Sequence, residues 1–488
     1  LGEQQMNYRM IFKSLGSVLC IEAVCMVPSL LVSIIYSQGD TISFLLSIMI
    51  LVSLGLGLRR IKTITNNIYA RDGFAIVALG WLSVSIFGAL PFLISGAVPS
   101  VIDALFESAS AFSTTGASII REIEGLPKGI VFWRSFAHWM GGMGVLVLMI
   151  AILPSVKANT LHIMKAESPG PDPGKFVPRI KQTAKILYTI YVILTAVQVI
   201  FLLVGGMPLY DSLIHAFGTA STGGFSNRNA SVGAYGSVYI ETIITIFMLL
   251  FGVNFSLYYA FLKGNIKSVL RDEELRFYLG TVMIAILLIV FNTYGSVFQS
   301  LGESIRYTSF QVSSIITTTG YATADFTLWP AFSQALLVIL MFIGASAGST
   351  AGGMKCIRIL LLFKIIKREV IKIIHPRSVQ TVKINGRIVE EEILSGIMTF
   401  FFAYIAVFTA SVIIVSLDNK DLVSTATAVI ACLSNIGPGL GIVGPAGNFA
   451  DFSLTSKAVL SLCMIIGRLE IYPILLLFAP TFWKRVNM

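Results

Sequence analysis

The chain has 488 residues, of which 55% are hydrophobic and only 12% charged, and its mean hydropathy is +0.83. Soluble globular proteins carry about 25% charged residues, so the composition excludes an ordinary soluble enzyme or binding module and indicates an integral membrane protein. The net charge of +10 does not predict nucleic acid as a partner, because the basic residues gather in alternate loops, as membrane topology requires.

The sequence predicts an all-α fold with about ten transmembrane helices, since roughly 20 apolar residues cross a bilayer as a helix. The predicted spans cover 10–36, 42–58, 73–96, 130–153, 184–204, 238–262, 277–294, 329–363, 393–416 and 456–481. Four semi-polar segments between them are too short to cross, at 101–113, 208–220, 300–316 and 421–433. We expect these to be re-entrant helices, which lipid tolerates only when protein surrounds them.

A polar run around a glycine follows each short helix. The four runs are FSTTGAS (112–118), TASTGGFS (219–226), IITTTGYAT (315–323) and CLSNIGPGL (432–440). Their key glycines, Gly116, Gly223, Gly320 and Gly437, lie about a hundred residues apart, which indicates an internal repeat. We therefore divide the chain into two leading helices (1–70) and four repeats of helix, pore helix, filter and helix (71–160, 161–265, 266–370 and 371–488).

Most of the 35 Lys and Arg residues fall in loops on one side of the membrane if the N-terminus is cytoplasmic. Basic residues favour the cytoplasmic side of membrane proteins. The sequence therefore predicts a multi-pass protein with a cytoplasmic N-terminus, in which all four polar runs enter from the outer face.

Four such runs around one axis have the chemistry of a cation filter. Backbone carbonyls arranged in rings can replace the hydration shell of a potassium ion, and glycine supplies the positive φ that such a backbone needs. The predicted ion-binding residues are Thr114, Thr115, Gly116, Ser221, Thr222, Gly223, Thr318, Thr319, Gly320, Asn435, Ile436 and Gly437. A single run of this kind more often marks close helix packing, but four copies after four short helices favour the filter.

The predicted eighth span contains GASAGSTAGGMK (344–355), where repeated glycines disfavour a helix. One interpretation is a tightly packed small-residue helix. The other is an unwound loop that gates the pore, with Gly344, Gly348, Ser349, Gly352 and Gly353 as its residues.

Arg468 lies within the last apolar span. A charged residue there is costly and marks a functional position. Glu470 is a possible structural partner, although residues two apart on a helix do not face each other. We expect Arg468 and the 344–353 segment to form the closed gate together.

The four glycine runs, together with GASAGSTAGGMK and IGRLEIYP (466–473), resemble the Trk/Ktr/HKT superfamily of potassium transporters, and most closely its TrkH-type branch. The resemblance covers essentially the whole chain and implies potassium selectivity, because all four filter positions are glycine. It also implies an intramembrane gating loop and an arginine in the pore. The fourth run departs from the pattern, since Asn435 and Ile436 replace hydroxyl residues.

The resemblance further implies a homodimer in the bacterial inner membrane that binds a cytosolic TrkA-like regulatory ring, which itself binds NAD(H) or ATP. We expect the basic inner loops at 157–185 and 364–387 to be the docking sites for this ring. Potassium is the expected ion, and no covalently bound cofactor is expected.

Two other classes of function compete with a potassium pore. We do not expect an enzyme, because the predicted spans hold no cluster of acids, histidines and nucleophiles and no nucleotide-binding loop. A secondary potassium or sodium transporter coupled to H⁺ or Na⁺ predicts two inverted halves, whereas this chain shows four parallel units. Parallel units favour a pore but leave the coupling open.

Overall fold

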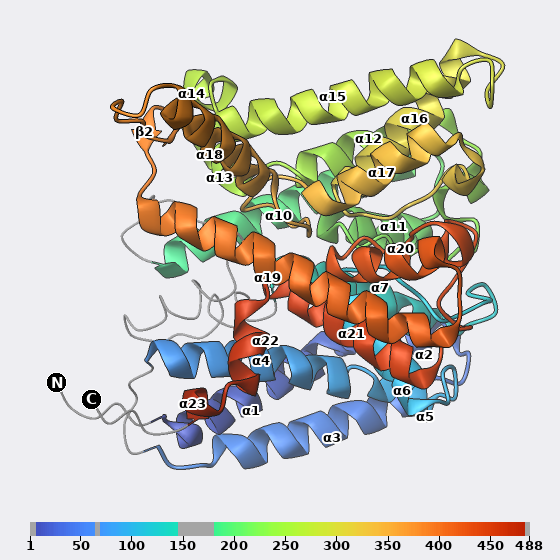
Figure 1. Cartoon of the computed structure of the whole chain (residues 1–488). Helices are drawn as coiled ribbons and strands as arrows, with labels where there is room; N and C mark the ends of the chain where they lie inside the picture. Colours follow the sequence, from blue (N-terminus) through green and yellow to red (C-terminus); the bar gives the residue numbers. More distant parts are fainter. Residues whose placement is uncertain (1–5, 64–68, 145–179, 484–488) are drawn as a thin grey trace.

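Long apolar helices run side by side through the molecule and enclose four short ones (Figure 1). The computed structural model describes residues 6–63, 69–144 and 180–483. Within these residues the only sheet is a two-stranded antiparallel hairpin, β1 (Lys383–Ile384) and β2 (Arg387–Ile388). The predicted all-α membrane architecture is confirmed.

In chain order, a leading part precedes four groups of helices, called units below, each of which contains one of the short helices. The leading part holds α1 (Tyr8–Cys25), α2 (Val27–Tyr36) and α3 (Thr41–Arg59). The first unit is α4 (Ala70–Phe87), α5 (Leu90–Ile94), α6 (Val101–Ser113) and α7 (Lys128–Gly142), and the second is α10 (Ile180–Val204), α11 (Leu209–Ser221), α12 (Val238–Phe251), α13 (Phe255–Leu262) and α14 (Ile266–Leu270). The third is α15 (Glu273–Thr293), α16 (Leu301–Ile316), α17 (Ala331–Ile343) and α18 (Cys356–Ile374), and the fourth is α19 (Glu391–Val415), α20 (Leu422–Leu433), α21 (Leu454–Arg468), α22 (Tyr472–Phe478) and α23 (Pro480–Trp483).

Six stretches of the described chain are long and apolar enough to cross a membrane: Tyr8–Tyr36, Thr41–Arg59, Arg71–Ile94, Ala184–Val204, Glu273–Thr293 and Glu391–Asp418. Each coincides with a predicted span. A seventh candidate is the pair α12 and α13, which is bent by 90°. The remaining predicted spans correspond to shorter or broken helices, and the part of the 130–153 span after Gly144 lies outside the described residues.

Two spans predicted as continuous are broken, and each break has a local cause. In the 238–262 span the Asn254 side chain accepts the Ser256 amide (2.9 Å) and so caps a new helix, α13. In the 456–481 span Glu470 and Ile471 both have positive φ, and Pro473 stands in the first turn of α22. Neither residue at the second break is a glycine, so this backbone is held in place by its surroundings.

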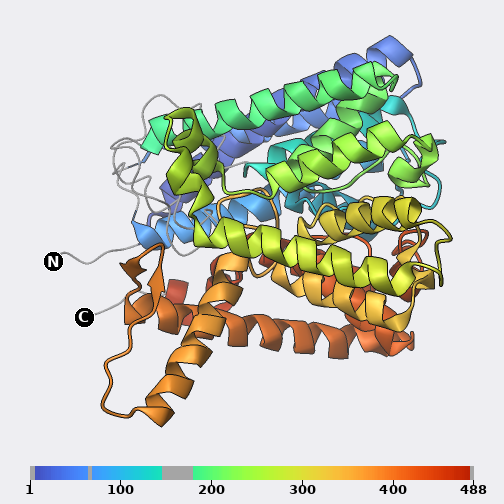
Figure 2. The same cartoon turned by 90° about the horizontal axis from the view of Figure 1, so that it is seen from above.

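The hairpin and α23 lie at one end of the bundle, and α18 leaves the bundle at this end (Figure 2). The first and last described helices meet there, where the rings of Tyr8 and Trp483 stack at 6.3 Å. The short helices α6, α11, α16 and α20 lie inside, and every residue in the C-terminal half of each is fully or largely buried. This burial satisfies the condition for re-entrant helices, because protein rather than lipid surrounds them.

Candidate functional site: a ring closed by four chain segments

The four short helices end in the same way. A left-handed residue follows each helix by one or two positions, with φ between 57 and 59° at Thr114, Thr222, Thr318 and Asn435. The amide of the next residue bonds to the carbonyl five positions earlier, at 2.8–3.0 Å in all four. This is the Schellman ending of a helix, which glycine usually completes. Threonine is β-branched and rarely adopts this conformation, so three of the four endings hold strained backbone of the kind that clusters at functional sites.

A glycine with positive φ follows two residues after each left-handed residue. These glycines are Gly116 (81°), Gly224 (75°), Gly320 (79°) and Gly437 (99°). Any other residue would be strained at such an angle. The common pattern is therefore Thr or Asn, any residue, then Gly.

The common pattern corrects the predicted register of the second segment. Gly224, not Gly223, occupies the position of Gly116, and Gly223 occupies the position of Thr115. The sequence comparison paired the first glycine of each run, whereas the spacing from the left-handed residue identifies the second glycine here. Gly223 and the other eleven predicted ion-binding residues still lie within the four segments.

The four segments close on one another in a cycle. A Cβ atom added to any of the four glycines would meet a backbone carbonyl oxygen of the next segment at a distance that no real Cβ shows. The contacts run from Gly116 to the carbonyl of Gly223, from Gly224 to Thr319, from Gly320 to Ile436, and from Gly437 back to Thr115. Each carbonyl belongs to the residue before the next segment's glycine. Four carbonyls and four glycines therefore form one closed ring.

The ring has the electrostatics of a cation site. The C-terminal ends of α6, α11, α16 and α20 stop directly before it, and a helix C-terminus carries partial negative charge. The four ring glycines line a single cavity of about 140 Å³ together with the segments that follow them. One water needs about 10–15 Å³ by the same measure, so several waters or a partly hydrated cation fit in it.

Asn435 differs from its threonine counterparts in what its side chain does. Its amide donates to the Thr115 hydroxyl (2.9 Å) and to the Met464 carbonyl (2.8 Å). The predicted departure in the fourth run therefore joins the first segment to α21. Asn435 and Ile436 are both fully buried.

The 344–355 segment is an unwound loop, as the gate interpretation expects. α17 ends at Ile343, α18 begins at Cys356, and Gly344, Gly348 and Gly353 have φ of 69–74°. The Gly352 amide donates to the Thr318 hydroxyl at 2.7 Å, and a Cβ on Gly352 would strike the Ser434 carbonyl. The Ser349 hydroxyl stays within the loop and donates to the Ser346 carbonyl (2.6 Å). The loop therefore packs directly against the third and fourth ring segments, which follow α16 and α20.

Arg468 at the end of α21 bridges this loop to the first unit. Its guanidinium donates to the Thr350 carbonyl at 2.8 Å, and to the carbonyls of Gly141 (2.5 Å) and Gly142 (2.7 Å) at the end of α7. Glu470, the structural partner considered from the sequence, forms an ion pair with Arg358 of α18.

Two residues that the sequence did not single out also hold the loop. The Glu274 carboxylate accepts the Ala347 amide at 2.6 Å, and the Phe255 amide donates to the Gly348 carbonyl at 3.0 Å. Glu273, the neighbour of Glu274, accepts the amide of Asn385 in the hairpin at 2.8 Å. The start of α15 thus contacts both the loop and the hairpin, which only the folded chain brings together.

The acidic residues near the cavity are mostly paired with other groups. Glu107 pairs with the buried Arg134, and Asp451 pairs with Arg121. Glu107 also accepts the Ile119 amide (3.1 Å), which fixes the chain just after the first ring segment. Because basic side chains neutralise these carboxylates, the backbone carbonyls are the main groups beside the cavity that are able to bind a cation.

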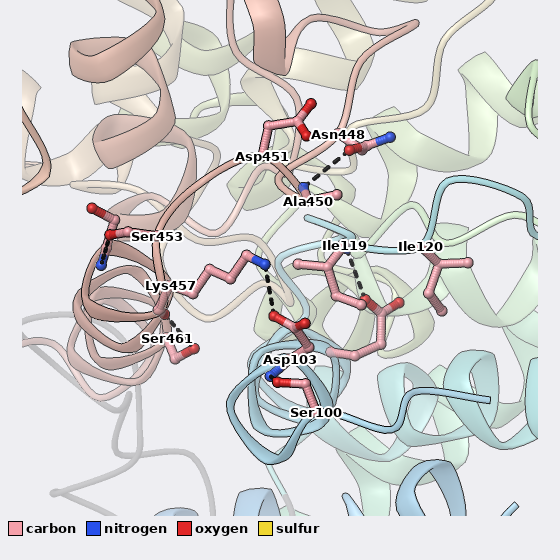
Figure 3. Close-up of polar contacts among 12 residues, drawn as sticks. Ser100, Asp103, Ile119, Ile120, Asn448, Ala450, Asp451, Ser453, Lys457 and Ser461 are labelled. Carbon is pink, nitrogen blue, oxygen red and sulfur yellow. Dashed lines mark hydrogen bonds and ion pairs between the residues drawn. The ribbon is translucent and has the colours of Figure 1, made fainter. Parts of the chain in front are cut away.

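Two buried ion pairs join neighbouring units around the ring. Lys457 of α21 binds Asp103 of α6 at 2.7 Å (Figure 3), and Glu241 of α12 binds Arg306 of α16 with two bonds of 2.6 Å. Lys457 and Glu241 are both the fourth residue of a helix that a serine caps. Equivalent positions thus carry opposite charges, and each ties a short helix to the preceding unit.

Known proteins of one family match this chain over nearly its whole length. Residues 41–485 match the TrkH family model, described as a cation transport protein. The chain is 40% identical to the Trk system potassium uptake protein TrkH of Salmonella typhimurium and 38% identical to that of Escherichia coli K12, with 98% of this chain and 100% of each relative covered. The crystal structure of the potassium transporter TrkH from Vibrio parahaemolyticus superposes with a TM-score of 0.88 at 37% identity, covering 98% of this chain and 100% of that one.

Proposed function

The chain belongs to the TrkH family of cation transport proteins, and from this premise we propose that it takes up potassium through the closed ring of backbone carbonyls. The family is one of transporters and not of enzymes. The observation that carries the proposal is the cyclic contact of each ring glycine with a carbonyl of the next segment. Replacing a cation's water shell by carbonyls is how potassium filters select their ion.

The closed gate is the second part of the proposal. The 344–353 loop, held by Arg468 and by the Thr318 hydroxyl, blocks the path below the ring. The positive charge of Arg468 adds an electrostatic barrier against cations. Opening requires two hydrogen bonds to break, the one from Arg468 to the Thr350 carbonyl and the one from the Gly352 amide to Thr318.

Regulation is the third part. We propose a homodimer in the bacterial inner membrane with a cytoplasmic N-terminus, in the four-repeat division given above. A cytosolic TrkA-like ring that binds NAD(H) or ATP docks on the basic side, where α18 and the hairpin project. The contacts of Glu273 with Asn385 and of Glu274 with Ala347 supply a short path from this surface to the loop. The other predicted docking segment, 157–185, falls largely outside the described residues.

Flux into proteoliposomes that hold the full chain tests the proposal. We expect potassium and rubidium to move down their gradients in preference to sodium and lithium, without an imposed proton or sodium gradient. Equal flux of all four ions would contradict the carbonyl filter. Uptake only under a proton or sodium gradient would instead support the coupled transporter considered above.

A further inference from the structure

The second filter segment lacks a side chain that the other three possess. Gly223 stands where the other segments have Thr115, Thr319 and Ile436, all fully buried. The Thr115 hydroxyl bonds to Ser113 at 2.7 Å, and the Thr319 hydroxyl bonds to Thr317 at 2.8 Å. These side chains fill the space behind the ring and fix their own peptide units. Segment two must fill the same space in another way.

The backbone does not require glycine at this position. Gly223 is not among the residues with positive φ, and its counterparts are β-branched residues. The close neighbour is instead a side chain from α7. A Cβ atom on Gly223 would lie 2.7 Å from Cδ2 and 2.8 Å from Nε2 of His138, closer than real side chains approach.

Two contacts fix the ring of His138. It is fully buried. Its Nδ1 lies 2.5 Å from the Ala111 carbonyl at the end of α6, and because a carbonyl only accepts, Nδ1 carries the proton. Its ring stacks on Phe225 with centroids 4.0 Å apart and an angle of 18°.

Arg134, one turn earlier on α7, completes the arrangement. Its guanidinium carbon lies 3.5 Å from the centre of the Phe225 ring. Two groups this close to one ring centre must occupy its opposite faces, so Arg134 and His138 enclose Phe225 between them. Arg134 also donates to the Ser226 carbonyl at 3.2 Å and pairs with Glu107. Residues four apart on a helix point the same way, so Arg134 and His138 of α7 contact the second segment on both sides of Gly224.

We propose that His138 is a positioning residue of the filter: its imidazole takes the place of the side chain that Gly223 lacks and fixes the Gly223 carbonyl in the ring. This carbonyl is the one that Gly116 contacts. His138 therefore acts on ion selectivity through the Gly223 peptide and touches no ion itself. The inference rests on the proposed filter function.

The test is a double-mutant cycle on Gly223→Thr and His138→Ala, read as the potassium-to-sodium flux ratio in proteoliposomes. We expect Gly223→Thr alone to lower the ratio about tenfold, which corresponds to about 1.4 kcal/mol, because the new side chain meets the imidazole and displaces the Gly223 peptide. His138→Ala alone should also lower it. The double variant should recover most of the ratio, because threonine then fills the imidazole's space as it does in segments one and three. Gly280→Thr, in open space on α15, is the matched control.

The outcomes separate this inference from the proposed function. Absence of potassium-selective flux in the wild-type chain would refute the filter itself. A selective wild type with an unchanged ratio in Gly223→Thr, or with no recovery in the double variant, would overturn the role of His138. Lower thermal stability of His138→Ala with an unchanged ratio would show a structural role only and would also overturn it. If Gly223→Thr does not fold but the double variant does, a potassium-to-sodium ratio in the double variant above that of His138→Ala supports the positioning role. An equal ratio, or a double variant that also fails to fold, overturns it.

Discussion

Arg468 donates to the carbonyl of Thr350 at 2.8 Å, and this bond joins residues 118 positions apart into one unit. Its other two bonds go to Gly141 and Gly142. A single side chain therefore connects the interrupting loop of the third unit, the last span of the fourth and the second span of the first. Loss of this side chain should free the loop without disturbing the ring.

Arg468→Ala should raise basal potassium flux in the absence of a regulatory subunit. The change removes the charge barrier and three charge-assisted hydrogen bonds, each contributing about 1.5–3 kcal/mol. Flux of potassium and rubidium into proteoliposomes measures the effect. Arg468→Lys keeps the positive charge but lacks the planar guanidinium that reaches three carbonyls at once, so it should give an intermediate flux. An unchanged flux in a folded Arg468→Ala protein would remove Arg468 from the gate.

Gly116→Ser should lower the potassium-to-sodium flux ratio. The new Cβ would strike the Gly223 carbonyl, and φ of 81° disfavours a side chain, so that segments one and two must move apart. The strain at such an angle amounts to about 1–3 kcal/mol. Gly125→Ser, at a position with no atom near the added Cβ, is the control and should leave the ratio unchanged. Equal ratios in both variants would contradict the closed ring.

Thr318→Val should loosen the loop while leaving the backbone as it is, because valine is also β-branched. It removes the acceptor of the Gly352 amide, and an unpaired buried amide costs about 1–3 kcal/mol. If the closed state loses this free energy, basal flux should rise roughly 5- to 150-fold. Thr222→Val serves as the comparison, since the Thr222 hydroxyl donates to the Ser221 carbonyl within its own segment. A similar rise in both variants would argue against a specific loop contact.

The buried Lys457–Asp103 pair (Figure 3) should matter more for stability than the exposed Arg121–Asp451 pair. Lys457→Ala leaves a largely buried carboxylate, with side-chain exposures of 7% and 22% for the pair, and should lower the free energy of unfolding by about 2–4 kcal/mol. Arg121→Ala breaks a pair that is 68% and 65% exposed and should cost under about 1 kcal/mol. Thermal unfolding in detergent distinguishes the two. The exchange Lys457→Asp with Asp103→Lys should recover part of the loss, and no recovery would mean that the pair contributes packing rather than charge.

The sequence by itself determined the class of protein, the spans that are continuous helices and the four short helices, and it left open whether the 344–355 segment is a packed helix or an unwound loop. Apolar length and composition carry these features, because a bilayer accepts only backbone that is hydrogen-bonded internally. The sequence also located the four filter runs, since glycine beside small hydroxyl residues repeats at a fixed spacing. The resemblance to a known family added the ion, which spacing alone does not provide.

Only the tertiary structure decided the register and the partners. Whether Gly223 or Gly224 faces the ring depends on where α11 ends, and adjacent glycines do not mark that point. The pairing of Glu470 with Arg358 and the contact of Glu274 with Ala347 join residues 112 and 73 positions apart. His138 looked like a dispersed histidine because its partners lie on α6 and on the second filter segment. Such contacts depend on how the units pack around a common axis. The residue pattern within one unit does not predict which residues of another unit will lie beside it.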